Sequence, residues 1–258
     1  MKRLLMNQSL AMCYTSKSQK IRVMSEAWTE AEVICPACGN ALKSAPNNSK
    51  VFDFFCTKCT EEYELKSNAK SLEKKVSDGS YDSMISRLNA LQSPHFFFMG
   101  YDITRYEVKN FFVVPSYFLR PASIEKRKPL SASARRAGWV GCNILLDKIP
   151  EVGRISYVKD GLFTQSYSVM DAWKKTAFLA EAKSIESRGW TIDVLRCVER
   201  IGQTEFSLEQ VYKFETELAK HHPNNNFVKD KIRQQLQVLR DRGFVEFASR
   251  GKYRLVKS

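Results

Sequence analysis

The sequence predicts a mixed α/β domain followed by a smaller, mainly helical domain, and three observations support this. Apolar, aromatic segments bounded by turn signals are interspersed with amphipathic segments up to about residue 183. After that point, three helical segments are followed by two short alternating strands. Two Cys-x-x-Cys pairs lie within the first part. We therefore expect one domain at 1–183 and a second at 184–258.

The first domain should combine one sheet with a few helices. Ile21, Met24 and Trp28 recur at helical spacing, so residues 7–30 are expected to be helical. The polar residues 68–79 are expected to form a connecting segment, and a helix is expected at 81–91. Apolar or alternating runs predict strands at 51–55, 63–67, 96–101, 111–114 and 154–158.

The second domain has the element order of a winged helix. A helix with an apolar stripe covers 191–198, and Ser207 is a suitable N-cap for a second helix. A third helix is expected from 225 to 242, where Gly243 ends it. Short strands at 244–247 and 252–255 complete the pattern, which is a variant of the helix-turn-helix motif.

Composition favours a polyanionic partner. The chain has 258 residues and a formal net charge of +13. A basic surface without such a partner is the alternative explanation of the charge. No apolar run approaches the roughly 20 residues that span a bilayer, and the first residues do not continue as a signal peptide. We expect a cytoplasmic protein that has no membrane partner.

Four of the cysteines have the spacing of a structural zinc site. Cys35 and Cys38 form one Cys-x-x-Cys pair, and Cys56 and Cys59 form the second. The intervening 17 residues fall in the usual range for two such pairs that share one ion. A redox motif would leave one pair unexplained. Because four cysteines fill a tetrahedral shell, we expect this Zn²⁺ to be structural.

Three charged residues beside the second cysteine pair are candidates for metal-dependent chemistry. In a strand, Glu64 and Lys66 share a face, and a hairpin can bring Asp53 beside them. Two carboxylates suit Mg²⁺, which polarises a phosphodiester and lowers the pKa of bound water. The lysine can orient that water or stabilise developing charge. Alternating charges on a solvated strand are the other explanation, but Asp53 lies in an apolar run, where a charge needs a partner.

The second domain offers two groups of candidate DNA contacts, although a solvated face is the competing explanation of each. In its third helix, arginine and glutamine can read guanine and adenine edges, and the hairpin is better placed for phosphates. The helix candidates are Lys229, Lys231, Arg233, Gln234 and Gln235, and the hairpin candidates are Arg250, Lys252 and Arg254.

These residues lead to a family resemblance over nearly the whole chain. The sequence resembles the DpnI-like restriction endonucleases, which cut GATC when its adenine is N6-methylated. The most specific shared blocks are 18–20, the cysteine segment with 61–67, 127–130, 134–144, 187–192, 231–237 and 250–254. The resemblance implies a PD-(D/E)xK nuclease domain with an inserted zinc site, followed by a winged helix. Phe52 stands where the superfamily motif has proline.

The resemblance also implies roles. It implies that Asp53 and Glu64 bind Mg²⁺ and that Lys66 is the third catalytic residue of a type IIM endonuclease. In the nuclease domain it implies DNA contacts at Arg135, Arg136 and Trp139, to which we add Arg127 and Lys128 of the same basic stretch. We expect a monomer acting on methylated double-stranded DNA. The alternatives are a non-catalytic zinc and winged-helix regulator and a related nuclease with another target.

Overall fold

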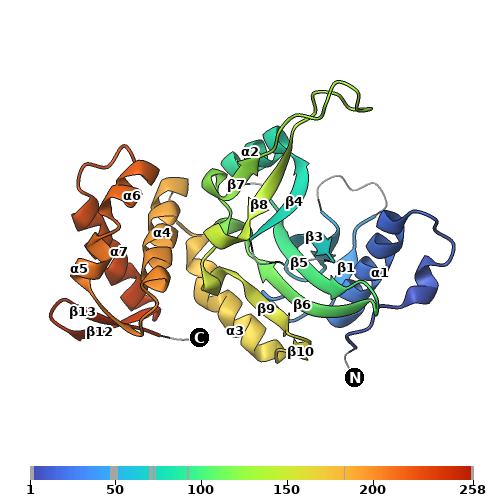
Figure 1. Cartoon of the computed structure of the whole chain (residues 1–258). Helices are drawn as coiled ribbons and strands as arrows, with labels where there is room; N and C mark the ends of the chain where they lie inside the picture. The colour runs from blue at the N-terminus through green and yellow to red at the C-terminus, as the bar shows by residue number, and fades with distance from the viewer. Residues whose placement is uncertain are drawn as a thin grey trace. The chain divides into compact units, whose positions relative to one another are not determined.

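A computed structural model describes residues 3–46, 52–69, 72, 74–91, 93–182 and 184–256. It confirms the mixed α/β class with a C-terminal helix-turn-helix domain. The chain divides into two compact units (Figure 1). One comprises Met1–Asp147 and Gly153–Thr176, and the other comprises Lys148–Val152 and Ala177–Ser258. None of the helices in the described ranges is long and apolar enough to cross a membrane.

A seven-stranded sheet organises the first unit, in the order β1-β2-β3-β5-β6-β9-β10. Neighbouring strands are antiparallel except β3 and β5, which run parallel. The strands are β1 (Leu42–Ser44), β2 (Phe54–Cys56), β3 (Glu62–Asn68), β5 (His95–Asp102), β6 (Glu107–Val114), β9 (Ile155–Lys159) and β10 (Leu162–Phe163). Residues 96–99 in β5 are fully buried, as in a central strand covered on both faces.

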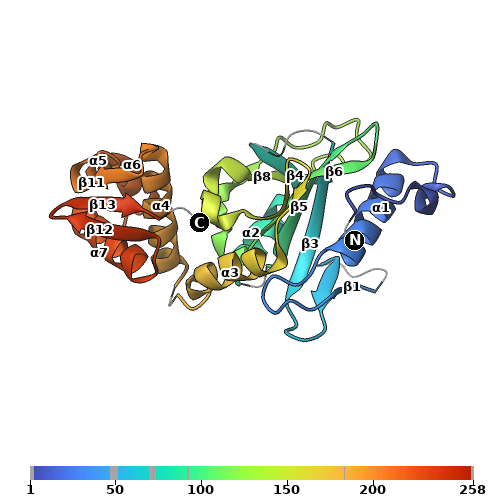
Figure 2. The ribbon, with the colours of Figure 1, turned by 90° about the horizontal axis from the view of Figure 1, so that it is seen from below.

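Two helices, α1 (Lys17–Glu32) and α3 (Ser166–Thr176), pack on one face of this sheet (Figure 2). Trp28 of α1 and Trp173 of α3 belong to the same buried cluster as Phe97 and Phe111. The first helix starts later than predicted. The side chain of Asn7 instead caps a separate 3-10 turn, Gln8–Ala11.

The second sheet of this unit has the order β4-β8-β7. Its strands are β4 (Lys75–Ser80), β7 (Ile124–Lys126) and β8 (Gly141–Leu145), and α2 (Tyr81–Asn89) follows β4 directly. The expectation that 68–79 is only a connecting segment is therefore wrong for its second half, which forms most of β4. Strand β4 carries one buried apolar residue, Val76, and is held by pairing with β8. In both views β4 lies beside β3 and β5 (Figures 1 and 2).

The second unit has the predicted winged-helix order with one additional helix. Its elements are α4 (Ile185–Ile201), β11 (Glu205–Ser207), α5 (Leu208–Tyr212), α6 (Glu215–His221), α7 (Val228–Asp241), β12 (Val245–Ser249) and β13 (Lys252–Leu255). The additional helix, α6, was not predicted. Ser207 caps α5 as predicted, in a capping box with Gln210. Gly202 ends α4 with φ 69°, a conformation that favours glycine. Further short 3-10 helices lie at Ser116–Phe118, Pro121–Ser123, Leu146–Lys148, Glu151–Gly153 and Ala177–Leu179.

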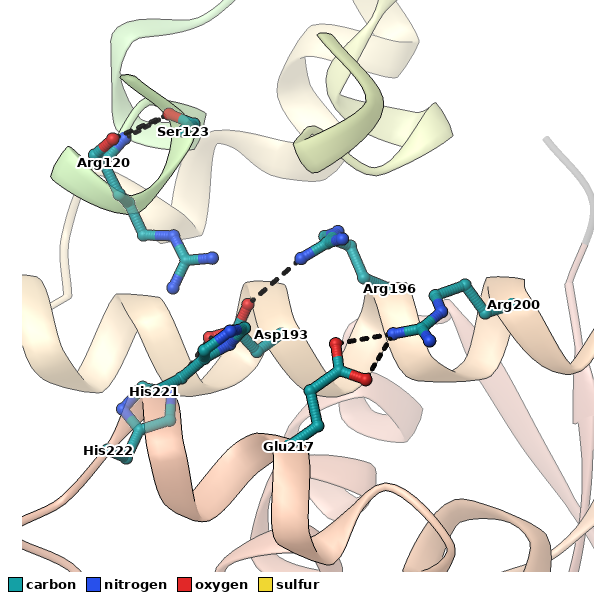
Figure 3. A network of polar contacts seen from close by, with 8 residues as sticks. All are labelled: Arg120, Ser123, Asp193, Arg196, Arg200, Glu217, His221 and His222. Carbon is teal, nitrogen blue, oxygen red and sulfur yellow. Dashed lines mark hydrogen bonds and ion pairs between the residues drawn. The ribbon is translucent and has the colours of Figure 1, made fainter. Parts of the chain in front are cut away.

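A polar network joins α4 to α6 in this unit (Figure 3). Asp193 of α4 is buried, and its carboxylate lies 3.0 Å from Nε2 of His222. The ring of His222 stacks on Trp190 with 3.9 Å between the centroids. About two helical turns further along α4, Arg200 donates two hydrogen bonds, of 2.6 and 2.7 Å, to the Glu217 carboxylate. These contacts fix α6 against α4 beside the apolar core.

Candidate active site and DNA-binding surfaces

The four predicted zinc ligands form one cluster. Their Sγ atoms all lie within 4.8 Å of one another. Cys35 approaches Cys59 at 3.4 Å, and Cys38 approaches Cys56 at the same distance. Tetrahedral sulfur ligands about 2.3 Å from one Zn²⁺ lie about 3.8 Å apart, so this cluster fits the ion. Cys56 ends β2, and Cys59 lies in the turn before β3, so a bound zinc clamps that hairpin.

Tyr63 connects the cysteine cluster to β3. Its hydroxyl lies 3.2 Å from Sγ of Cys35, and its ring is fully buried against Phe97 with 4.7 Å between the centroids. Burial and the neighbouring Cys35 raise the pKa of Tyr63 far above its usual value, so the phenol stays protonated. A protonated phenol can donate to a cysteine thiolate. The next residue in the strand is Glu64.

The two faces of β3 differ as predicted. Tyr63 and Leu65 pair with His95 and Phe97 and pack on the core that α1 and α3 cover. Glu64 and Lys66 therefore face the opposite side of the sheet. The Lys66 ammonium donates to Oε1 of Glu64 at 2.5 Å.

The structure brings Asp53 to the same strand. Its Oδ2 accepts a hydrogen bond of 2.7 Å from the backbone amide of Leu65, between Glu64 and Lys66. A second hydrogen bond, from the Asp53 amide to the Tyr63 carbonyl, fixes the backbone at 2.8 Å. The three predicted catalytic residues are thus assembled on one hairpin.

Two further residues, which were not among the predicted site residues, contact this group. Asp78 of β4 forms an ion pair with Lys66, and Arg87 of α2 lies 3.4 Å from Oε2 of Glu64. Burial raises the pKa of Glu64 in spite of the neighbouring Lys66. Burial alone would lower the pKa of Lys66, but the Glu64 and Asp78 carboxylates outweigh it and raise that pKa. The lysine therefore stays an ammonium ion. No local motif marks Asp78, because only the pairing of β4 with β8 fixes its place.

The basic stretch of the first unit forms an exposed, closed loop between β7 and β8. At its base the Leu130 amide donates a hydrogen bond to the Trp139 carbonyl, and the Leu130 carbonyl accepts one from the Gly138 amide. Of the predicted DNA contacts, Arg127, Lys128, Arg135 and Arg136 are exposed and Trp139 is half-buried. The Arg136 guanidinium lies 4.7 Å from the centre of the Trp139 ring. The loop therefore presents cations around one aromatic side chain.

Helix α7 exposes part of its predicted polar face. Lys229 and Gln234 are exposed, and Lys231 is half-buried. Arg233 is exposed as well, but it pairs with Asp230 and donates a hydrogen bond of 2.9 Å to the Tyr212 hydroxyl. Glu215 lies 3.4 Å from the Lys229 ammonium. DNA phosphates would have to compete with these acidic partners for both cations.

The prediction that Gln235 lies on the exposed face is wrong. Its exposed fraction is 4%, and its Oε1 accepts a hydrogen bond of 2.6 Å from the Thr191 hydroxyl. The side chain lies beside Ile232 and Leu236 on the buried side of α7, because helical spacing places residue 235 on the stripe that faces α4. Gln235 holds α7 to α4 and is not available to DNA.

The hairpin of β12 and β13 carries the remaining predicted contacts. Arg250, Lys252 and Arg254 are all exposed. Arg254 donates a hydrogen bond of 2.7 Å to Glu205 across the sheet. Arg250 lies in the turn, where it can reach a phosphate without breaking a strand contact.

Comparison with known families covers both units. The family described as "DpnI: Dam-replacing family" matches residues 2–182, and the domain described as "DpnI_C: Dam-replacing HTH domain" matches residues 186–255. The first match contains the cysteine cluster and the Asp53, Glu64 and Lys66 hairpin. The second contains the helices and the hairpin of the winged-helix unit. Together they indicate a nuclease that binds DNA.

Proposed function

The chain belongs to the Dam-replacing family, and we propose that it is a Mg²⁺-dependent restriction endonuclease of type IIM that cleaves double-stranded DNA at GATC sites containing N6-methyladenine. The family supports a methylation-dependent restriction endonuclease. The observation that carries the catalytic part is the assembly of Asp53, Glu64 and Lys66 on one hairpin.

We assign the Mg²⁺ ligands to Asp53 and Glu64, because carboxylate oxygens are the ligands that this ion prefers. When bound, Mg²⁺ supplies polarisation of the scissile phosphodiester and a water of lowered pKa. The amide of Leu65 holds the Asp53 carboxylate in place. Lys66, which is protonated and beside Glu64, orients the attacking water or stabilises the charge that develops on the phosphate.

The cysteine cluster is proposed to hold a structural Zn²⁺. Four thiolates leave no coordination position for a catalytic water, so the ion contributes rigidity rather than chemistry. It closes the turn between β2, which Asp53 directly precedes, and β3, which contains Glu64.

Recognition is assigned to both units. Arg127, Lys128, Arg135, Arg136 and Trp139 form the contact surface of the nuclease unit, because they cluster on one exposed basic loop. In the winged-helix unit the proposed contacts are Lys229, Lys231, Arg233, Gln234, Arg250, Lys252 and Arg254. A net charge of +13 supports a DNA partner. The protein is proposed to act as a monomer in the cytoplasm.

Digestion of paired plasmids tests this function. With Mg²⁺, the purified protein should cut plasmid from an adenine-methylating host and spare the same plasmid from a host that lacks the methylase. Equal cutting of both plasmids would remove the methyl specificity and favour a nuclease with another target.

Variants test the active site separately. Asp53→Asn and Lys66→Ala should abolish cleavage and retain specific DNA binding, measured with Ca²⁺ in place of Mg²⁺. Asp82→Asn is the matched control, since it removes one negative charge from the exposed start of α2. If wild type binds methylated DNA and cuts none, the regulator is the better explanation.

A further inference from the structure

Asp78 is a buried carboxylate that none of the proposed catalytic roles uses. Its side chain has an exposed fraction of 2%, compared with 18% for its ion-pair partner Lys66. Its second oxygen, Oδ2, is buried and has no hydrogen-bond partner among the described residues. A buried carboxylate is costly unless it is paired, so its position beside Lys66 requires an explanation.

The backbone places Asp78 there through a contact between two sheets. Asp78 belongs to β4, whose sheet is separate from the one that holds Lys66. The register of β4 with β8 is regular through Asp78, which lies opposite Cys142, so strand alternation puts its side chain on the same face of β4 as Val76. The Asp78 carboxylate there meets the face of β3 that carries Glu64 and Lys66.

The Lys66 ammonium has two anionic partners with different surroundings. Glu64 lies 2.5 Å away through Oε1, and its Oε2 is also 3.4 Å from Arg87. If Glu64 binds a metal, as proposed above, part of its charge is directed to that ion. Asp78 lies on the other sheet and remains a partner for Lys66.

From this arrangement we infer that Asp78 is a positioning residue that holds the Lys66 ammonium in the active site while Glu64 serves the metal. This inference rests on the proposed function. Asp78 acts through Lys66 and does not touch the substrate. An uncharged residue at position 78 would leave Lys66 with Glu64 as its main anchor, so the lysine would be less well placed for the reaction.

Asp78→Asn tests the role with little change of shape. In single-turnover cleavage at saturating methylated DNA, we expect a rate about 10- to 100-fold below wild type, which is typical when a supporting residue is lost. The dissociation constant for DNA, measured with Ca²⁺, should not change. Asp82→Asn again controls for the loss of one negative charge. A cleavage rate within about twofold of wild type, a drop too small for a lost supporting residue, overturns the inference.

Mg²⁺ binding separates positioning from metal ligation. Addition of Mg²⁺ should raise the Tm of Asp78→Asn as much as it raises that of wild type, whereas Asp53→Asn should lose the shift. Loss of the shift in Asp78→Asn would make Asp78 a metal ligand and overturn the inference.

A double-mutant cycle on thermal stability tests the contact itself without any cleavage. Lys66→Met should lower the Tm, because it leaves Asp78 buried without its cation. Adding Asp78→Asn to Lys66→Met should raise the Tm again, since the unpaired charge is then removed. Additive losses would show that the two side chains are not coupled and would overturn the inference. If wild type cuts no DNA, the proposed function fails, and this cycle still decides whether Asp78 holds Lys66.

Discussion

We expect the hydrogen bond between Tyr63 and Cys35 to strengthen zinc binding. Tyr63→Phe removes one hydroxyl, which lies 3.2 Å from the Cys35 sulfur, and leaves the buried ring in place. Because a zinc-bound Cys35 would be a thiolate, the lost bond is one to a charged acceptor.

Such a bond contributes about 1.5–3 kcal/mol. Each 1.4 kcal/mol corresponds to a factor of about 10 in affinity, so the upper limit is roughly a hundredfold. Sulfur is a weak acceptor, and the lower end therefore applies. We expect Tyr63→Phe to bind Zn²⁺ about tenfold more weakly than wild type.

The assay is competition with a chromogenic chelator of known affinity, at fixed pH. Tyr157→Phe is the matched control, because its hydroxyl donates a 2.7 Å hydrogen bond to the Ile34 carbonyl and none to a ligand sulfur. That variant should lose about 1–3 kcal/mol of folding stability through the unpaired carbonyl and retain wild-type zinc affinity.

Equal zinc affinity for Tyr63→Phe and wild type would refute the reasoning. So would an equal loss for both variants, since it would show a general effect of the core. With zinc in excess, Tyr63→Phe should cleave methylated DNA at the wild-type rate, because the change acts on metal occupancy rather than on the chemistry.

Three further outcomes are expected. Stripping zinc with a strong chelator should abolish cleavage in fresh Mg²⁺, and adding Zn²⁺ should restore it, as measured by plasmid digestion. Gln235→Ala should destabilise the protein by about 1–3 kcal/mol in urea, because the buried Thr191 hydroxyl loses its acceptor, whereas the exposed Gln234→Ala should cost less than about 0.5 kcal/mol and weaken DNA binding. The pKa of Glu217 is lowered by its hydrogen bonds to Arg200, so its stabilisation is present at neutral pH and is lost as the pH falls through that pKa. Glu217→Gln should therefore be less stable than wild type at pH 7, by up to about 1 kcal/mol in the free energy of unfolding. This difference in stability should vanish in acid.

The features that the sequence predicted well depend on neighbouring residues. A Cys-x-x-Cys pair forms at a single turn, and two such turns at a suitable separation predicted the cluster that the structure contains. Alternation along one strand predicted that Glu64 and Lys66 share a face and that Tyr63 faces the core. The cap at Ser207 likewise involves only the next three residues.

Sequence alone therefore determined the cysteine cluster, the charged face of β3 and the order of the winged helix, because short-range geometry fixes each of them. Tertiary structure decided the position of Asp78, since β4 has almost no apolar pattern and its place depends on pairing with β8. It also decided the partner of Gln235: helical spacing places this residue on the stripe of Ile232 and Leu239, but only the packing of α7 on α4 brings its Oε1 to the Thr191 hydroxyl. A side chain's distant neighbours follow from the packing of segments far apart in the chain, and no local pattern records them.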